Sequence, residues 1–402
     1  MLNIKEQLHK SSHKKILTHI SSLSEELSMP SYIVGGYVRD LILNKETIDI
    51  DIMVEGDAIV FAKKLSNKLN INNIVLYEKF QTALIPCKEI HIEIATARTE
   101  EYSPDSRKPK VQATSIEQDL SRRDFTINSI AISLNNADYG SIVDPFNGIK
   151  DIENKLIKTP VNADKTFKED PLRMLRAIRF ASQLDFNIDK KVLKEIQKQK
   201  DRLEIISWER ITEEIIKSLK TKKPSVAFYL FKETDLLSYI FPEIDIMPGV
   251  EVIDGHGHKD VFIHTLQVID NAAELTDKME IRFAALVHDI AKPNTKKFVP
   301  EKGWTFHGHD SIGSYMIRDI AKRMKLSNKF RNYLQLMTKL HLRPIALVKK
   351  NITDSAIRRL MVEAGECIDD LMILCRADIT TKNAMKVKKY RANFERVEKL
   401  MH

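Results

Sequence analysis

The stretch from residue 33 to residue 54 constrains the fold and the chemistry of this chain more than any other. Residues 48–52 read Ile-Asp-Ile-Asp-Ile, so isoleucines fall on one face of a strand and Asp49 and Asp51 on the other. Two residues of strand rise separate the two carboxylates by about 6.6 Å along the backbone. Like charges this close repel each other, and bound Mg²⁺ is the usual reason to tolerate them. The alternation therefore predicts a carboxylate pair that shares divalent cations about 3.5–4 Å apart, the arrangement used for in-line phosphoryl chemistry.

A pair of glycines stands just before that strand. Gly35 and Gly36 allow a tight turn and a close approach of the backbone to a ligand, because they carry no Cβ atom. The apolar residues that follow have helical spacing, which predicts a helix that begins near Tyr37. Free backbone N–H groups at the start of such a helix favour a phosphate. A diglycine alone is a weak signal for phosphate binding, and the carboxylate pair downstream makes it a strong one.

A second alternating run, residues 90–95, contributes another carboxylate. Ile92 and Ile94 face one way and Glu93 faces the other. Glu93 can therefore lie on a strand that pairs beside the strand of Asp49 and Asp51. The alternative is that Glu93 is only a solvent-facing strand residue.

Composition limits the class of protein. With 402 residues, 43% of them hydrophobic, the chain can bury more than one core, and two to four subdomains are expected. It has no run of eighteen apolar residues, no signal-peptide core at its N-terminus, and three cysteines without disulfide or zinc spacing. We therefore expect a cytoplasmic protein with no membrane partner. A net charge of +8 and a pI near 9.0 suit a polyanionic partner, although lysine-rich compositions also arise from AT-rich genomes.

Three further segments complete the predicted organisation. Residues 1–30 fit one amphipathic helix, and the polar, proline-containing segment 98–114 fits a mobile loop. The Arg-Arg-Asp cluster at 122–124 enters a predicted apolar helix and can hold phosphate or ribose hydroxyls. It can equally be a capped helix start with solvated arginines. After residue 160 the strand signals fade and helices predominate.

The segment around Asp170 predicts nucleotide choice. Asp170 and Arg173 are three residues apart and can present an acceptor beside a donor on one side of a helix. Cytosine and adenine carry the complementary pattern on their pairing edge, whereas uracil and guanine carry the reverse, which would leave buried polar groups unpaired. The alternative is structural, because an Asp followed by Pro171 is typical of an N-cap and first helical residue. Arg176 and Arg179 continue Arg173 as a basic stripe at near-helical spacing.

Histidines cluster in the C-terminal half of the chain. An adjacent His-Asp pair at 288–289 lies in an otherwise apolar helical segment. A lone histidine there would more often be a core residue, but His264 upstream and Asp378 downstream favour a divalent-metal site for Mn, Fe, Ni, Zn or Mg. His309 and His341 can complete a second metal position. A water molecule on such a metal could attack phosphate esters.

Together these motifs resemble those of the class II tRNA nucleotidyltransferases, the CCA-adding enzymes, and of the related bacterial poly(A) polymerases. The resemblance covers roughly residues 15–380 and consists of five motifs in the same order. The matching residues are Gly35-Gly36 with Asp49 and Asp51, Glu93, Arg122-Arg123-Asp124-Phe125 through Asn128, Glu169-Asp170 with Arg173, and, for an HD domain, His264, His288, Asp289 and Asp378.

The resemblance implies a fold. The N-terminal part is expected to be an α+β nucleotidyltransferase head of the DNA polymerase β-like kind, a small mixed sheet with helices, over residues 1–160. An all-α neck and body for base and RNA binding follows over residues 161–250. An all-α HD domain occupies residues 251–380, and a C-terminal helix or tail residues 381–402.

It also implies a reaction, the addition of C, C and A to the 3′ end of tRNA from CTP and ATP by two-metal nucleotidyl transfer. For the metals and the attack, the resemblance implies that Asp49 and Asp51 hold two Mg²⁺ and that Glu93 assists at the metal or the attacking hydroxyl. For the nucleotide, it implies that the triphosphate is held by Gly35, Gly36, Arg39 and Arg123, the sugar by Asp124 and Asn128, and that the base is chosen by Asp170 and Arg173, with Arg176 and Arg179 extending the nucleotide-binding set. For the HD domain, it implies that Mn²⁺, Ni²⁺ or another divalent ion is bound by His264, His288, Asp289 and Asp378, with His309 and His341 as candidates for a second ion.

Three alternatives stay open. The chain can be a bacterial poly(A) polymerase or add only part of CCA, although Gly-Gly-Tyr-Val-Arg-Asp at 35–40 fits the CCA-adding form better. A flexible loop at 98–114, which CC-only enzymes lack, favours full addition. The HD domain can instead be the main activity, a phosphodiesterase or phosphatase acting on 2′,3′-cyclic or 3′-phosphate RNA ends. The third reading is an RNA-binding module without catalysis. The sequence leaves monomer and homodimer equally open.

Overall fold

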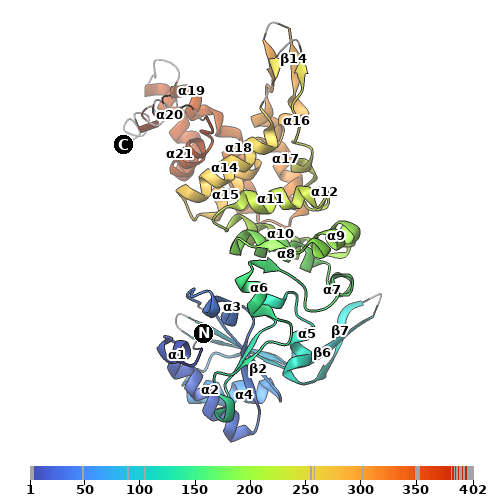
Figure 1. The fold of residues 1–402 in the computed structure, drawn as a ribbon. Coiled ribbons are helices and arrows are strands. Elements are labelled where there is room, and N and C mark those ends of the chain that lie inside the picture. Colours follow the sequence, from blue (N-terminus) through green and yellow to red (C-terminus); the bar gives the residue numbers. More distant parts are fainter. Residues whose placement is uncertain are drawn as a thin grey trace. The chain divides into compact units, whose positions relative to one another are not determined.

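The computed structural model describes most of the chain, and its contacts divide the chain into two compact units (Figure 1). The described residues are 4–47, 49–87, 90–103, 106–253, 256–257, 259–300, 302–348 and 354–381, with the isolated positions 383, 385, 388, 392, 394 and 395. The first unit comprises Met1–Arg173 with Phe186–Glu195, and the second comprises Met174–Asp185 with Ile196–His402. Most of the predicted C-terminal tail lies outside the described residues.

A seven-stranded mixed sheet forms the centre of the first unit. Strands β2 and β5 run parallel, and the other neighbouring strands are antiparallel. This confirms the mixed sheet with helices that was predicted for an α+β head. In spatial order the strands are β3 (Val75–Tyr77), β4 (Thr82–Pro86), β5 (His91–Thr96), β2 (Asp49–Val54), β1 (Ser31–Val34), β8 (Ala131–Ser133) and β9 (Ile142–Val143).

The two faces of this sheet differ as the alternation predicted. The isoleucines at 50, 52, 92 and 94 are at most 1% exposed and belong to the core of the first unit. Helix α4 (Ala58–Lys68), which Asp57 caps at its N-terminus, packs against β4 and β5. On the other face Asp51 lies directly opposite Glu93, which confirms the predicted pairing of the two strands.

The N-terminal segment forms two helices rather than the single predicted one. Helices α1 (Ile4–Lys10) and α2 (Lys14–Leu27) are separated by a bend. At the bend, Ser11 Oγ and His13 Nδ1 lie 3.1 and 3.2 Å from the hydroxyl of the buried Tyr37, which belongs to α3 (Gly36–Ile42). Both helices still bury their apolar residues, so the hydrophobic period alone did not reveal the bend.

Two further predictions about the first unit were wrong. The segment predicted as a mobile loop is an antiparallel hairpin, β6 (Arg98–Ser103) with β7 (Ser106–Ala113), whose backbone ladder needs no apolar alternation. The apolar residues after the Arg-Arg-Asp cluster do not form a helix. They form a 3₁₀ turn, η2 (Thr126–Asn128), and then strand β8, because they fill the core beside β1.

The remaining elements of the first unit are short. They are α5 (Ile116–Ser121), α6 (Gly148–Glu153), α7 (Ala163–Glu169), the 3₁₀ turns η1 (Glu78–Phe80) and η3 (Asn136–Asp138), and the parallel pair β10 (Leu156–Ile157) and β11 (Asn187–Ile188).

The second unit is built from helices, as predicted for the body and the HD domain. Two of them, α8 (Leu172–Leu184) and α9 (Lys190–Gln199), cross unit boundaries along the chain. The ribbon of β14 and β15 extends away from the helices of this unit (Figure 1). The other elements are η4 (Lys200–Ile205), α10 (Trp208–Leu219), α11 (Pro224–Glu233), α12 (Leu237–Ile240), α13 (Pro242–Asp245), β12 (Val252–Ile253), β13 (His256–Gly257), α14 (Val261–Leu275), α15 (Met279–Val287), α16 (Lys292–Thr295), β14 (Lys297–Val299), β15 (Gly303–Thr305), α17 (His309–Arg323), α18 (Asn328–Leu340), α19 (Leu342–Val348), α20 (Asp354–Ala364), η5 (Gly365–Cys367) and α21 (Ile368–Ala377). Among the described residues, no helix combines the length and the apolar character needed to cross a bilayer.

Candidate functional site

The three carboxylates predicted for the head, Asp49, Asp51 and Glu93, line one cavity of about 510 Å³. Strand β2 carries the first two and strand β5 the third, and the parallel register sets Asp51 directly opposite Glu93. The start of α3 forms another wall of the same cavity, with Gly36 and Arg39. The structure therefore brings the acidic strands and the glycine turn together in one place.

The glycine turn lies against charged groups that leave little room for a side chain. Gly35 has a φ of +70°, a conformation that L residues rarely adopt. A Cβ atom built there would lie 3.1 Å from Arg123 Nη1 and 3.3 Å from Asp51 Oδ2. Glycine at this position thus lets the backbone, a guanidinium and a carboxylate approach one another closely.

Charge crowding shows in the ionisation of Asp51. Burial, followed by the nearby carboxylates of Glu93 and Asp49, raises the pKa of Asp51 to about 6, and the guanidinium groups of Arg123 and Arg39 offset only part of this rise. Because its surroundings destabilise the charged form of Asp51, this carboxylate fits a site where a bound cation stabilises that form. Three carboxylates offer only oxygen ligands, the kind that Mg²⁺ prefers.

Arg39, Asp124 and Asn128, predicted as triphosphate and sugar contacts, are bonded to one another. Arg39 is 4% exposed, and its Nε and Nη2 donate to the two carboxylate oxygens of Asp40 at 2.8 and 2.9 Å. Its Nη1 donates to Asn128 Oδ1 at 2.8 Å, and Asn128 Nδ2 donates to Asp124 Oδ1 at 3.1 Å. This network joins α3 to the segment around η2.

Asp119 is a buried carboxylate beside the candidate site that the sequence reasoning missed. Its carboxylate is fully buried and accepts from Arg122 Nη2 at 2.6 Å, Arg123 Nε at 3.2 Å and the backbone N–H of Arg98 at 3.3 Å. It thereby holds the arginine that lies beside Gly35. An acidic residue three and four positions before two arginines at the end of a helix is a signal that could have indicated this role.

The residues predicted to choose the base are held by local contacts. Asp170 Oδ1 accepts from the backbone N–H of Leu172, as predicted for a cap, although α8 begins at Leu172 rather than Pro171. Arg173 Nη1 donates to Glu169 Oε2 at 3.1 Å, and its Nη2 donates to the carbonyl oxygen of Arg122 at 2.7 Å. Their role in base choice stays a prediction.

Arg176 and Arg179 belong to the second unit and share an acidic partner. Arg179 is buried, and its Nε donates to Glu214 Oε2 at 2.6 Å. Arg176 Nη1 lies 4.0 Å from Glu214 Oε1. The Arg179 guanidinium also lies over the ring of Phe180, 4.0 Å from its centroid. Arg179 is thus part of the packing of the second unit, and its predicted contact with a nucleotide stays untested.

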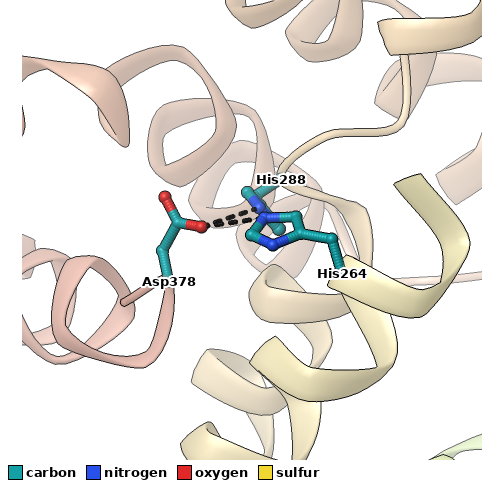
Figure 2. Close-up of side chains that lie close together, drawn as sticks. All are labelled: His264, His288 and Asp378. Atoms are coloured by element: carbon teal, nitrogen blue, oxygen red, sulfur yellow. Dashed lines mark ion pairs between the residues drawn. The ribbon is translucent and has the colours of Figure 1, made fainter. Parts of the chain in front are cut away.

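The predicted HD residues converge in the second unit (Figure 2). Among the described residues, two groups of three have potential ligand atoms within 4.8 Å of one another: His264, His288 and Asp378, and Asp289, His309 and His341. In the first group Asp378 Oδ1 lies 2.9 Å from His264 Nε2 and 3.7 Å from His288 Nε2. Asp289 connects the groups, because its Oδ2 lies 3.2 Å from His288 Nε2 and its Oδ1 lies 3.3 Å from His309 Nε2.

All four histidines use their other ring nitrogen to fix their orientation. The Nδ1 atoms of His288, His309 and His341 lie 2.8, 2.7 and 2.6 Å from backbone carbonyl oxygens, and His264 Nδ1 lies 3.0 Å from the hydroxyl of Thr380. An Nδ1–H that donates to a carbonyl leaves Nε2 as the free lone pair, the tautomer of a metal ligand.

Two buried atoms at the centre have no hydrogen-bond partner, which fits a metal position. They are His288 Nε2 and Asp289 Oδ1. Burial alone would lower the pKa of His288, but the nearby carboxylates of Asp289 and Asp378 have the larger effect and raise it. The contacts of Asp289 with the histidines likewise outweigh its burial and hold the pKa of Asp289 below its usual range. A cluster that stabilises a proton this strongly can equally hold divalent cations, and its nitrogen and oxygen ligands suit Mn, Fe, Ni or Zn.

Comparison with known proteins matches three parts of the chain to described families. The "Poly A polymerase head domain" matches residues 31–158, the "Probable RNA and SrmB-binding site of polymerase A" matches residues 185–247, and the "HD domain" matches residues 261–383. The order is the one that the motifs predicted.

Two curated relatives match nearly the whole chain. The multifunctional CCA protein of Pseudoalteromonas atlantica is 32% identical over 379 residues, which cover 90% of this chain and 88% of that protein. The one of Shewanella frigidimarina is 30% identical over 397 residues, which cover 93% and 88%. The Thermotoga maritima CCA-adding enzyme complexed with tRNA-CCA shares the fold, with a TM-score of 0.68 and 22% identity over 99% of this chain and 86% of that one. Because the curated relatives match through both the head and the HD domain, this chain belongs to the family of the multifunctional CCA proteins, the CCA-adding tRNA nucleotidyltransferases.

Proposed function

We propose that this chain adds C, C and A to the 3′ end of tRNA, with CTP and ATP as substrates. The observation that carries the proposal is that three carboxylates share one cavity with the glycine turn. The curated relatives are named multifunctional CCA proteins, and the Thermotoga enzyme with the same fold is complexed with tRNA. These names support the acceptor and the product.

The residues of the cavity divide the chemistry among them. Asp49 and Asp51 would hold two Mg²⁺, which neutralise the triphosphate and acidify the 3′-hydroxyl of the primer. The backbone at Gly35 and the guanidinium of Arg123 would bind the triphosphate, since both border the space beside Asp51. Glu93, directly opposite Asp51, would orient the attacking hydroxyl. The 3′ oxygen then bonds to the α-phosphorus in line with the departing pyrophosphate.

Base choice would come from Asp170 and Arg173. The carboxylate accepts from an exocyclic amino group, and the guanidinium donates to the adjacent ring nitrogen, as cytosine and adenine require. The hydrogen bonds of Arg173 to Glu169 and to the Arg122 carbonyl support this role, because they limit the directions in which the guanidinium can donate.

The decisive experiment uses three tRNA transcripts, ending before CCA, after C and after CC, each incubated with one labelled nucleotide at a time. The wild-type chain should add C, C and A in turn. The double variant Asp49→Ala/Asp51→Ala should incorporate neither nucleotide while still binding tRNA. The matched double variant Glu117→Gln/Glu153→Gln removes two acidic residues from exposed positions of the head and should behave as wild type.

The outcomes separate the alternatives. Incorporation by the double aspartate variant would remove the metal assignment. Long A tracts on generic RNA would identify a poly(A) polymerase, and activity on only one transcript would identify a partial CC- or A-adding enzyme. Specificity for tRNA with a single CCA supports the proposal.

A second activity is favoured by two buried atoms of the histidine cluster that make no hydrogen bond, His288 Nε2 and Asp289 Oδ1. We infer that the HD domain hydrolyses phosphate esters at RNA ends, 2′,3′-cyclic or 3′-phosphate, with Mn²⁺, Ni²⁺ or another divalent ion. The ion would supply an activated water. His264, His288 and Asp378 would hold one ion, and Asp289, His309 and His341 would hold a second.

This activity is tested by phosphate release from 2′,3′-cyclic nucleotides with added Ni²⁺ or Mn²⁺. His288→Ala should abolish the release, whereas His307→Ala, which changes an exposed histidine, should keep it. Hydrolysis that survives His288→Ala would contradict the assignment. CCA addition should be unaffected in either variant.

The same proposal assigns a task to each predicted region. Residues 1–160 carry the transfer chemistry, 161–250 the base and RNA contacts, 251–380 the HD site, and 381–402 a C-terminal tail. We place the protein in the cytoplasm, because its three cysteines are all free thiols and free thiols are typical of reducing compartments.

A further inference from the structure

The face of the sheet that carries the carboxylates continues past them as an apolar surface. Residues directly opposite one another on paired strands point to the same face. The register therefore lines up one row across four strands: Asp51 on β2, Glu93 on β5, Leu84 on β4 and Val75 on β3. Tyr77 lies two residues after Val75 and so shares this face.

This apolar surface is open to solvent where the sheet ends. Val75 is 43% and Tyr77 47% exposed, and β3 is the edge strand of the sheet. Leu84 lines the cavity of the carboxylates, so the surface is continuous with the site. We call Leu84, Val75 and Tyr77 the apolar ledge. Adjacent strands lie about 4.8 Å apart, which places Leu84 about 10 Å and Val75 about 14 Å from Asp51.

The geometry of the transfer reaction decides which substrate lies over the ledge. In an in-line displacement the attacking and leaving oxygens are on opposite sides of the phosphorus. The groups proposed to bind the triphosphate lie on the β1 side of β2. Gly35 directly follows strand β1, and Arg123 lies beside Gly35. Strands β5, β4 and β3 lie on the opposite side of β2. With the triphosphate proposed on the β1 side of β2 and Glu93 on β5, the in-line geometry favours an approach of the attacking hydroxyl from the ledge side.

We propose that the apolar ledge binds the 3′-terminal nucleotides of the RNA primer, with the terminal base packed on Leu84 and Val75 and a base stacked on the ring of Tyr77. This proposal rests on the nucleotidyl transfer proposed above. Single-stranded RNA ends are recognised by stacking on aromatic side chains, and stacking tolerates different bases. A sequence-tolerant surface suits an end that changes from one added nucleotide to the next.

The ledge also explains an unusual surface. An edge strand with exposed Val75 and Tyr77 invites pairing with other chains, and proteins commonly protect such edges with charge or proline. A hydrophobic ligand surface gives these two side chains a function that a plain edge strand would not have.

The experiment measures primer binding separately from nucleotide binding. Tyr77→Ala should raise the KM for tRNA about tenfold, which is about 1.4 kcal/mol, and leave the KM for CTP unchanged. Tyr77→Phe keeps the ring and should restore the wild-type KM. Val60→Ala is the matched control, because Val60 is similarly exposed, at 40%, on α4, which packs against the sheet by its other face.

A binding measurement without catalysis separates this proposal from the proposed activity. A tRNA that carries 2-aminopurine as the base next to its 3′-terminal nucleotide, the one proposed to stack on Tyr77, should change fluorescence on binding the wild type and Tyr77→Phe, and much less on binding Tyr77→Ala. An unchanged fluorescence response and unchanged KM for tRNA in Tyr77→Ala would overturn the proposal, as would an increase in the KM for CTP instead. An inactive wild type would refute the transfer activity, and with it this assignment.

Discussion

Asp119 provides the most direct test of how the head holds Arg123, the arginine proposed to bind the triphosphate. The carboxylate is fully buried, whereas the side chains of Arg122 and Arg123 are 22% and 19% exposed. Its Oδ1 accepts from Arg122 and from the backbone N–H of Arg98, and its Oδ2 accepts from Arg123. Asp119→Asn preserves the shape and one oxygen but replaces the other with a donor that faces a guanidinium. One arginine must then lose its partner.

The cost follows from the bonds that are lost. A hydrogen bond to a charged group contributes about 1.5–3 kcal/mol, and breaking a buried ion pair by removing one partner costs about 3–5 kcal/mol. Because both arginines reach solvent and can be partly rehydrated, we expect a loss near the lower limit, about 2–3 kcal/mol. For a unit of 150–250 residues, each kcal/mol lowers the Tm by about 2–4 °C, so the head transition should fall by about 4–12 °C.

The functional effect should be independent of the base. Arg123 would move away from Gly35, so the KM values for CTP and ATP should rise together, about tenfold, with their ratio unchanged. Thermal unfolding and steady-state kinetics measure the two effects, and Glu117→Gln, on the exposed side of the same helix α5, is the control. If Asp119→Asn shifts neither the Tm nor either KM, the carboxylate does not position Arg123 and the reasoning is refuted.

Three further predictions follow from buried or strained groups. Gly35→Ala should lower kcat/KM at least tenfold and destabilise the head by about 1–3 kcal/mol, because its φ of +70° and the nearby Arg123 both oppose a Cβ; near-wild-type kinetics would contradict this. The folded-state pKa of Asp51 is raised from 3.8 to about 6, so between these two pH values the metal-free folded head keeps a proton that the unfolded chain has released. The free energy of unfolding should therefore fall by up to about 3 kcal/mol as the pH rises from 3.8 to about 6. Mg²⁺ should accordingly raise the Tm more at about pH 7 than at about pH 5, compared with EDTA, and an equal rise at both would count against the site. Arg179→Ala should lower the free energy of unfolding, measured with urea, by about 3–5 kcal/mol, because it leaves Glu214 buried without its closest cation. A decrease below about 1 kcal/mol would mean that the Arg179–Glu214 pair does not stabilise the protein.

The sequence could predict the acidic cavity because a strand has a period of two. Isoleucines at 50, 52, 92 and 94 must face the core, and a slip of one residue would bury the carboxylates of Asp51 and Glu93 instead. The alternation therefore determines the face, whereas the pairing of the Glu93 strand beside the strand of Asp49 and Asp51 was one of two alternatives that the structure decided. The histidine cluster was predictable in part, because an adjacent His-Asp pair in an apolar segment has few structural explanations.

Other features of the fold and of the site could not be predicted, because they depend on contacts between residues far apart in sequence or have no local sequence pattern. The bend between α1 and α2 accompanies the contact of His13 with Tyr37, 24 residues away in sequence. The hairpin of β6 and β7 is held by backbone hydrogen bonds, and its composition resembles that of a loop. The role of Asp119 requires knowing that Arg123 lies beside Gly35, a contact between segments nearly ninety residues apart.

A single short segment connects the two tasks proposed for the head, triphosphate binding and base choice. Asp119 holds the side chains of Arg122 and Arg123, and the carbonyl oxygen of Arg122 accepts from Arg173. In the proposed arrangement an incoming nucleotide presents its base to Arg173 and its α-phosphate to the acidic strands at a fixed separation, and small misplacements of reacting groups reduce rates strongly. A backbone segment anchored at both ends keeps that separation constant for cytosine and adenine alike. The buried carboxylate of Asp119 is therefore expected to matter for catalysis even though it faces neither the base nor the phosphates.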